Sequence, residues 1–297
     1  MDECWAIDDQ KQSGFLEAAR RLRALNADLG FLLPNSLKSA ALFAAGKVEH
    51  RVGYDRDARR LLLTHPIALR PEDLAVHEVR YYLRLLRGWE TNYEEPSPLL
   101  LNVTDGEQVE MRSWLEAEGI GPQDFVIGVN PAAFFGTAKR WDADRFAAAA
   151  AHFASTRSGR VVVTGLPQER DVAQAVCDAG GAGFINAAGR MSLRQLMAFL
   201  ARCDLFLTND SGAMHIAAAL GTPLVAIFGS TDWVTTAPQS PRARIVRHPT
   251  PCAPCLLRHC PIDHRCMTSV SPAMVINEAE RMLAARAPSA PFTPSTT

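Results

Sequence analysis

The residues with the clearest chemical potential lie at 208–215 and read Thr-Asn-Asp-Ser-Gly-Ala-Met-His. An apolar run at 204–207 precedes them and an alanine-rich run follows, so a buried strand is predicted to end here and a helix to begin. Asp210 or Ser211 can accept hydrogen bonds from the first N–H groups of that helix, and Gly212 lets a ligand approach the backbone closely. Because a helix N-terminus at the carboxyl end of a strand favours anions, the segment fits a phosphate-binding loop as well as an ordinary helix cap.

A second candidate group is Lys139, in the loop 130–141 that follows a predicted strand at 125–129. A lysine there can neutralise a phosphate oxygen as a point charge, although most lysines are simply solvated. Since parallel strands end at one edge of a sheet, we expect Lys139 to lie near Asp210. The sequence has no Gly-x-x-x-x-Gly-Lys-Ser/Thr, which excludes a P-loop ATPase, and no strand-borne Gly-x-Gly-x-x-Gly, which disfavours a dinucleotide dehydrogenase. His215, one turn inside the following helix, is either a packed or surface residue or a contact for a phosphate or sugar hydroxyl.

Four of the seven cysteines fall in one short segment, at Cys252, Cys255, Cys260 and Cys266. Four thiolates can hold a structural metal, but these spacings are shorter than those of common zinc modules. The alternatives are reduced buried thiols or a redox pair. A disulfide framework is not expected for a protein of a reducing compartment.

The composition is that of an ordinary globular protein. The chain has 297 residues, of which 47% are hydrophobic and 21% charged, and its formal net charge is −1. No global field therefore favours nucleic acid or an anionic membrane. We find neither a signal peptide nor an apolar run long enough to span a bilayer, so the protein is predicted to be cytoplasmic.

The hydrophobic pattern predicts an α/β protein with parallel sheets and right-handed crossovers. Strands are expected at 28–33, 51–54, 125–129, 160–165, 183–186, 204–207, 222–229 and, at an edge, 244–246. Helices are expected at 11–26, 37–45, 72–87, 105–118, 142–155, 168–178, 192–201, 216–221 and 272–285.

Two glycines near 120 mark the predicted domain boundary. The expected organisation is an N-terminal domain at 1–122, a C-terminal domain at 123–287 and a disordered Pro/Ser/Thr-rich tail at 288–297. The N-terminal domain is predicted to be incomplete, because a doubly wound domain normally opens on a strand and the first clear strand comes only near 28.

Four stretches together resemble a known family. They are 33–40 (Leu-Pro-Asn-Ser-Leu-Lys-Ser-Ala), the loop 130–141 with its Ala-Lys-Arg-Trp ending, 208–215, and 221–229 (Gly-Thr-Pro-Leu-Val-Ala-Ile-Phe-Gly). In combination they are similar to the ADP-heptose:lipopolysaccharide heptosyltransferases, glycosyltransferase family 9, and most nearly to the heptosyltransferase II branch. The resemblance covers about residues 28–285.

The resemblance implies a GT-B fold, with two Rossmann-like domains facing across a cleft. The C-terminal domain would bind the nucleotide-sugar, and the N-terminal domain the lipopolysaccharide inner core at the inner face of the inner membrane. Transfer would be inverting and metal-independent: a base deprotonates an acceptor hydroxyl, which attacks the anomeric carbon as ADP leaves. Without a metal, the leaving diphosphate needs lysine and helix N–H groups as donors.

The resemblance also assigns roles to individual residues. Lys139 would stabilise the leaving diphosphate with help from Thr137. The other predicted binding residues are those of the loop around the phosphates and sugar, together with two that end neighbouring strands. They are Asp210, Ser211, Gly212 and His215, with Asn130 and Gly165.

One feature of the family has no counterpart here. Its presumed base is an aspartate in an early Gly-Asp turn, and no segment of this sequence matches that turn, because Asp8 and Asp9 lie in a different context. We therefore expect donor binding to survive better than turnover. The rival interpretations are a GT-B transferase with another nucleotide-sugar, a catalytically impaired sugar-nucleotide-binding homologue, and a cysteine-based metal or redox module.

Overall fold

The structure is a computed structural model that describes residues 4–7, 12–89, 98–133 and 135–285. The chain forms two compact units, Met1–Ser97 and Pro98–Thr297, which are described separately below. The predicted disordered tail at 288–297 lies outside the described residues. Among the residues described, no helix combines the length and the apolar character that a bilayer span requires.

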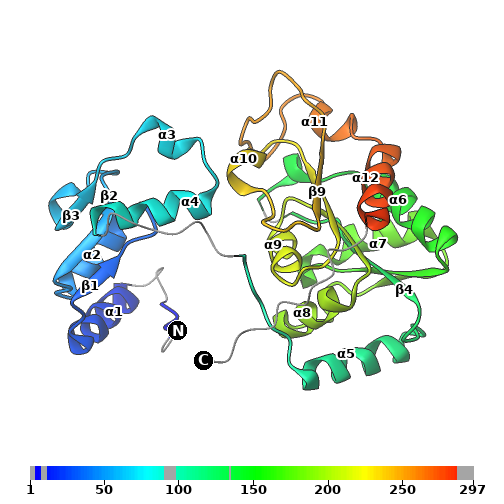
Figure 1. The fold of residues 1–297 in the computed structure, drawn as a ribbon, viewed down its shortest axis with the longest axis horizontal. Coiled ribbons are helices and arrows are strands. Elements are labelled where there is room, and N and C mark those ends of the chain that lie inside the picture. Colours follow the sequence, from blue (N-terminus) through cyan, green and yellow to red (C-terminus); the bar gives the residue numbers. More distant parts are fainter. Residues whose placement is uncertain (1–3, 8–11, 90–97, 134, 286–297) are drawn as a thin grey trace. The chain divides into compact units, whose positions relative to one another are not determined.

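The first unit is built on a three-stranded parallel sheet in the order β1-β2-β3 (Figure 1). The strands are β1 (Leu29–Phe31), β2 (His50–Tyr54) and β3 (His65–Ile67). The α-helices are α1 (Gln12–Leu25), α2 (Leu37–Ala45), α3 (Pro71–Leu74) and α4 (Glu78–Leu83), and the 3-10 helices are η1 (Arg60–Leu62) and η2 (Arg84–Gly88).

The predicted helix at 72–87 is wrong as a single element, because the chain breaks it into α3, α4 and η2. Helix α3 ends at Leu74, and His77 begins α4 by accepting a hydrogen bond from the N–H of Val79 through its ring Nδ1, at 3.2 Å. Histidine is not among the preferred N-cap residues, so His77 gives no sequence signal for a helix start. The apolar periodicity continues across the break between α3 and α4 and therefore predicts one helix.

A buried arginine holds the turn after β1. Arg59 is fully buried and donates from Nε to the carbonyl oxygen of Tyr54 at 2.8 Å, from one terminal nitrogen to Asn35 Oδ1 at 2.9 Å, and from the other to the carbonyl oxygen of Pro34. Asn35 in turn donates to the hydroxyl of Tyr81 at 2.7 Å. Each of the three guanidinium nitrogens donates a hydrogen bond, which offsets the cost of burying the charge.

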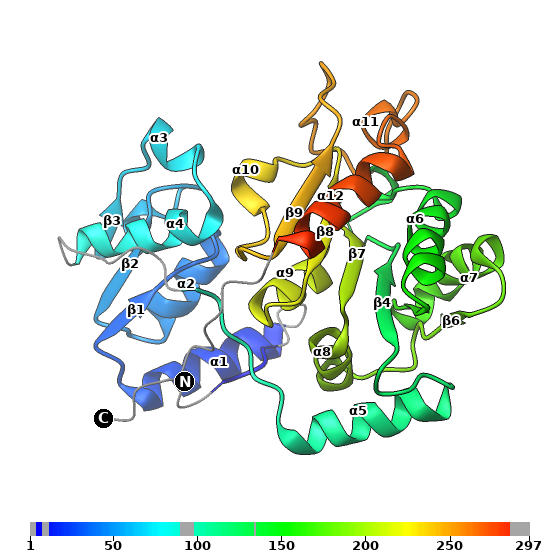
Figure 2. The ribbon, with the colours of Figure 1, turned by 45° about the vertical axis from the view of Figure 1, so that its right-hand side comes forward.

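The second unit is a six-stranded parallel sheet in the order β6-β5-β4-β7-β8-β9 (Figure 2). The strands are β4 (Phe125–Asn130), β5 (Gly159–Val163), β6 (Phe184–Asn186), β7 (Leu205–Asn209), β8 (Leu224–Phe228) and β9 (Ala243–Arg247). The α-helices are α5 (Asp105–Ala117), α6 (Ala143–Thr156), α7 (Arg170–Gly180), α8 (Leu193–Arg202), α9 (Gly212–Ala219), α10 (Trp233–Thr236), α11 (Arg265–Thr268) and α12 (Pro272–Ala284). Two 3-10 helices complete this unit, η3 (Thr137–Lys139) and η4 (Pro167–Glu169).

Helices cover both faces of this sheet, which confirms the doubly wound arrangement expected for the second half of the chain. Alternate residues of each strand point to opposite faces, so Leu205 and Leu207 pack with α6, α7 and α12 while Phe206 packs with α5, α8 and α9. The sheet is buried on both sides, and its strands therefore read as continuous apolar runs. Figure 2 shows the two helical layers on either side of the strands.

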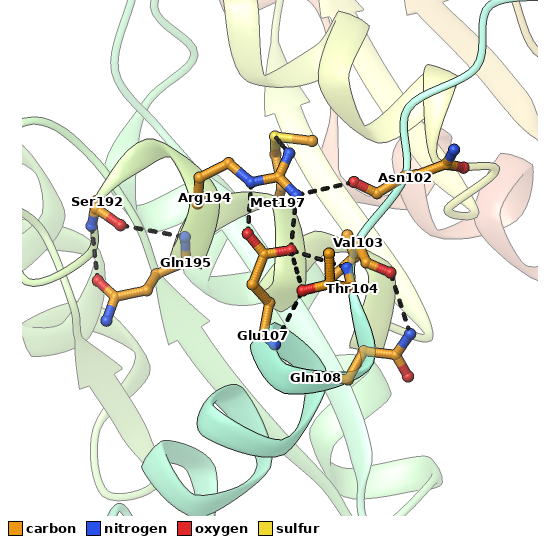
Figure 3. Close-up of polar contacts among 9 residues, drawn as sticks. All are labelled: Asn102, Val103, Thr104, Glu107, Gln108, Ser192, Arg194, Gln195 and Met197. Atoms are coloured by element: carbon orange, nitrogen blue, oxygen red, sulfur yellow. Dashed lines mark hydrogen bonds and ion pairs between the residues drawn. The ribbon is translucent and has the colours of Figure 1, made fainter.

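Helix α5 belongs to the second unit, whereas the sequence places residues up to 122 in the first domain. Met111 and Leu115 of α5 pack into the core beneath α8 and α9. Near its start, Glu107 forms a two-pronged ion pair with Arg194 of α8, at 2.5 and 2.6 Å, and Arg194 also donates to the carbonyl oxygen of Asn102 (Figure 3). The clamp fixes the first turn of α8 against α5.

Replacing Glu107 by glutamine should remove an acid-sensitive part of the stability. The hydrogen bonds from Arg194 and from the backbone of Thr104 lower the pKa of Glu107 from 4.5 to about 2. Because the folded pKa is the lower one, the carboxylate stabilises the fold above pH 4.5 and this contribution disappears as the pH falls toward 2. Urea unfolding from pH 6 to pH 2.5 should show a shallower pH dependence for Glu107→Gln than for the wild type. Glu110→Gln, an exposed position on the same helix, should leave the slope unchanged; equal slopes for both variants would contradict the clamp.

Candidate active site

Most of the predicted site residues follow two adjacent strands of the second unit, β4 and β7, while Gly165 follows β5. Strands β4 and β7 pair in parallel, with Asn130 at the end of β4 opposite Thr208 of β7. From β4 the chain adds β5 and β6 on one side of that strand. It then returns to add β7, β8 and β9 on the other side, so the strand order reverses between β4 and β7. Ligands of open α/β sheets bind outside the carboxyl ends of strands at such a reversal.

The long loop after β4 is tied to the tip of β7 by Asn209, which is fully buried. Its side-chain amide donates to the carbonyl oxygen of Pro131 at 2.7 Å, and its Oδ1 accepts from the N–H of Trp141 at 3.1 Å. One side chain therefore holds both ends of the loop that carries Lys139. Asn209 is not among the predicted site residues, although it lies within the segment 208–215.

The structure brings Lys139 and Asp210 together, as expected. Lys139 Nζ lies 2.7 Å from Asp210 Oδ2, and the two side chains are only 14% and 7% exposed. The same carboxylate oxygen accepts from the hydroxyl of Thr231 at 2.7 Å. Lys139 Nζ also sits 5.0 Å from the centre of the Phe135 ring. Because an ammonium has three donors, Lys139 can keep Asp210 and still bind an anion.

The expected side-chain cap of α9 is wrong. Ser211 is the N-cap residue by its backbone angles, but its side chain makes no capping hydrogen bond to the helix. The Ser211 hydroxyl instead lies 3.1 Å from the hydroxyl of Thr208, and Asp210 is engaged by Lys139. The N–H of Met214 donates to the carbonyl oxygen of Ser211 at 3.1 Å, so the N–H groups of Gly212 and Ala213 are the candidates for binding an anion at the N-terminus of α9.

A pocket of about 620 Å³ opens at this edge of the sheet, and all of its lining residues belong to the second unit. Seven of the eight predicted binding residues line it, namely Asn130, Lys139, Gly165, Asp210, Ser211, Gly212 and His215. Thr137 does not, because its hydroxyl turns to within 3.1 Å of the ring Nδ1 of His259. The pocket also has an apolar wall that was not predicted, made by Met191 just before α8, Leu193 and Leu196 of α8, and Ile216 of α9.

Two side chains of the pocket offer hydrogen-bond acceptors. Asn130 Oδ1 is buried and has no hydrogen-bond partner among the residues described. Glu169, at the end of η4, accepts from the N–H of Leu166 at 2.8 Å and lines the pocket with its carboxylate. The pocket thus combines a cation, helix N–H groups, acceptor oxygens and an apolar wall. Such a mixture suits a ligand with an anionic group, hydroxyls and an apolar ring.

The structure gives no support for a metal at the four clustered cysteines. Burial, reinforced by the thiols of Cys252, Cys255 and Cys260, raises the pKa of Cys266. Within the described part of the chain, no group of three or more His, Cys, Asp or Glu side chains is arranged to hold a metal ion. All seven cysteines are free thiols.

The fold and the site define a doubly wound α/β protein whose pocket, lined by Lys139 and the start of α9, lies where the strand order reverses. The sequence profile described as Glycosyltransferase family 9 (heptosyltransferase) matches residues 15–265. The chain therefore belongs to glycosyltransferase family 9, which confirms the resemblance noted from the sequence.

Individual relatives agree with this assignment. The chain is 34% identical over 236 residues to lipopolysaccharide heptosyltransferase 2 of Escherichia coli K12, which covers 76% of this chain and 66% of the relative. It is 35% identical over 163 residues to lipooligosaccharide heptosyltransferase 2 of Campylobacter jejuni, covering 53% of this chain and 51% of the relative. The matches thus span about half to two thirds of these relatives.

Solved structures extend the similarity to most of the chain. The structure of E. coli ADP-heptose lipopolysaccharide heptosyltransferase II superposes with a TM-score of 0.74 at 28% identity, covering 91% of this chain and 80% of that one. A family 9 glycosyltransferase from Veillonella parvula superposes with a TM-score of 0.82 over 95% of this chain and 82% of that one, at 24% identity, and shares the fold. These neighbours are consistent with the GT-B class expected from the sequence.

Proposed function

We propose that this protein is an inverting, metal-independent heptosyltransferase that uses ADP-heptose as donor and the lipopolysaccharide inner core as acceptor. The observation that carries the proposal is the 2.7 Å contact between Lys139 and Asp210 beside the uncapped N-terminus of α9. Departure of ADP places negative charge on a diphosphate. An ammonium and helix N–H groups that are already in place can stabilise that charge without a metal.

The remaining pocket residues suit the other parts of this donor. In the proposal, Glu169 and the unpartnered Oδ1 of Asn130 accept hydrogen bonds from sugar hydroxyls. The apolar wall on α8 and α9 takes the adenine ring. His215, which also lines the pocket, contacts a phosphate or a heptose hydroxyl. Thr137 is not assigned to the phosphates, because its hydroxyl is engaged with His259.

We assign acceptor recognition to the first unit and peripheral contact with the inner face of the inner membrane to the protein as a whole. A lipid-linked acceptor requires such contact, whereas the net charge of −1 gives no reason to expect nucleic acid as a partner.

The test measures ADP affinity and heptose transfer on one preparation, with and without EDTA. We expect ADP to bind, and ADP-heptose to be preferred over UDP- and GDP-linked sugars. Any heptose transferred should have the inverted anomeric configuration and be insensitive to EDTA. Binding of another nucleotide-sugar in preference would favour the alternative GT-B transferase. A wild-type chain that binds no nucleotide would contradict the proposal.

A side chain at Gly212 should block the donor without harming the fold. A Cβ at Gly212 would meet no atom within 4 Å, so a larger side chain has space there, and because Gly212 lines the pocket at the first turn of α9, a leucine would occupy room that the ligand needs. We expect Gly212→Leu to weaken ADP binding by about ten-fold or more with an unchanged melting temperature. Gly106→Leu is the matched control, since Gly106 is equally open and lies on α5 away from the pocket. Equal ADP affinity for both variants would show that the ligand binds elsewhere.

A further inference from the structure

The cysteine-rich segment 250–266 hydrogen-bonds to residues next to both members of the Lys139–Asp210 pair, on the Lys139 side and on the Asp210 side. Toward Lys139, the N–H of the buried Ala138 donates to the carbonyl oxygen of Arg258 at 3.0 Å. Toward Asp210, the carbonyl oxygen of Ser230 accepts from the N–H groups of Cys255 and Leu256 at 3.1 and 2.8 Å. Ser230 immediately precedes Thr231, whose hydroxyl binds Asp210.

The main chain of Arg258 lies so close to the loop that carries Lys139 that there is no room for a side chain at Gly136. A Cβ built at Gly136 would overlap the carbonyl oxygen of Arg258 and lie 2.9 Å from its Cα. The glycine is therefore required for this contact, three residues before Lys139. Next to it, Thr137 lies 3.1 Å from the ring nitrogen of His259, so residues 136–138 each meet the segment.

The guanidinium of Arg258 adds a side-chain contact on the pocket side. It lies 5.3 Å from the centre of the Phe135 ring, and Lys139 Nζ lies 5.0 Å from the centre of the same ring. Phe135 lines the pocket, but Arg258 does not. Two cations held by one aromatic ring restrict where that ring, and hence the lysine beside it, can lie.

We propose that Arg258 is a positioning residue for Lys139: through Phe135 and the main chain at 136–138, the cysteine-rich segment fixes the ammonium beside Asp210 in the orientation that receives the donor diphosphate. The inference deepens the proposed function and rests on it for the identity of the ligand. It gives this segment a role through its backbone and Arg258.

The test is a double-mutant cycle on ADP affinity with the full chain, using wild type, Arg258→Ala, Lys139→Ala and the double variant. If Arg258 acts through Lys139, Arg258→Ala should weaken ADP binding about five-fold in the wild type and less than two-fold in the Lys139→Ala background. Arg258→Lys should restore most of the affinity, because it keeps a cation over Phe135. The same fold-change in both backgrounds, or no change in either, would overturn the proposal.

Two further variants separate positioning from loss of structure. Arg265→Ala removes a charge from the same segment, where Arg265 is exposed and paired with Asp263 at 2.9 Å, and should leave ADP affinity unchanged. His259→Ala removes only the partner of Thr137 and should weaken ADP binding in the same direction as Arg258→Ala. An effect of Arg265→Ala equal to that of Arg258→Ala would overturn a specific role for Arg258.

A readout without ligand keeps this inference distinct from the proposed function. The coupling between Lys139 and Asp210, measured by urea unfolding of the single and double alanine variants, should fall to about half when Arg258 is alanine. An unchanged coupling would overturn the positioning role even if ADP binds. If the wild type binds no ADP, the proposed function fails, while this cycle still decides the inference.

Discussion

Lys139→Ala should weaken ADP binding by about 100-fold, the loss expected when one preorganised charged donor to a diphosphate is removed. Lys139 is the cation that the structure places at the carboxyl edge of β4 and β7, next to the first turn of α9. The alanine variant also leaves Asp210 without its cation at the pocket, which would add repulsion toward an anionic ligand. Isothermal titration with ADP measures the effect directly.

Two controls accompany this variant. Lys139→Arg keeps the charge and should retain most of the affinity, although a planar guanidinium does not reproduce the ammonium geometry. Arg281→Ala removes one positive charge from an exposed pair with Glu278 on α12 and should bind ADP as the wild type does. An unchanged dissociation constant for Lys139→Ala would remove the lysine from the donor site.

Breaking the Lys139–Asp210 pair should have the second large effect, on stability. Asp210→Ala leaves Lys139 in a site where it is 14% exposed and removes the acceptor of Thr231 as well. We expect the free energy of unfolding to fall by about 3 kcal/mol, because removing one partner of a buried pair leaves a charge uncompensated. The double variant Lys139→Ala/Asp210→Ala should lose less than the sum of the two single variants.

The exposed pair Arg281–Glu278, with side chains 74% and 32% exposed, is the matched control for this cycle. Its double-mutant coupling should be below about 0.5 kcal/mol, as for most solvated ion pairs. Urea unfolding of both sets gives the comparison. Additive losses at Lys139 and Asp210 would mean that the two side chains do not form the pair in solution.

Many of the strands of the second unit could be predicted from the local pattern of apolar and polar residues. The central strands β4, β7 and β8 are apolar runs bounded by turn residues, and polar residues at the ends of β4, β5 and β7 line the pocket. The same rule, polar residues that follow a strand, also points to Thr164 after β5 and to Thr231 after β8, which the sequence analysis did not use. Sequence spacing therefore predicted where Lys139 and Asp210 would meet.

Long-range contacts account for what the sequence did not predict. Asn209 binds atoms of Pro131 and Trp141, about 70 residues away along the chain, so no local pattern reveals its role. Asp210 does not cap α9 because a lysine 71 positions earlier competes for its carboxylate. Helix α5 packs with the second unit through Met111 and Leu115, and the glycines after it therefore mark a turn within that unit.

The measurement that bears most directly on the central claim is a crystal structure of this chain with ADP. We predict diphosphate oxygens at about 3 Å from Lys139 Nζ and from the N–H groups at the start of α9, with Asp210 still bound to the lysine. A nucleotide seated outside this pocket, or a diphosphate that contacts neither Lys139 nor the first turn of α9, would contradict it.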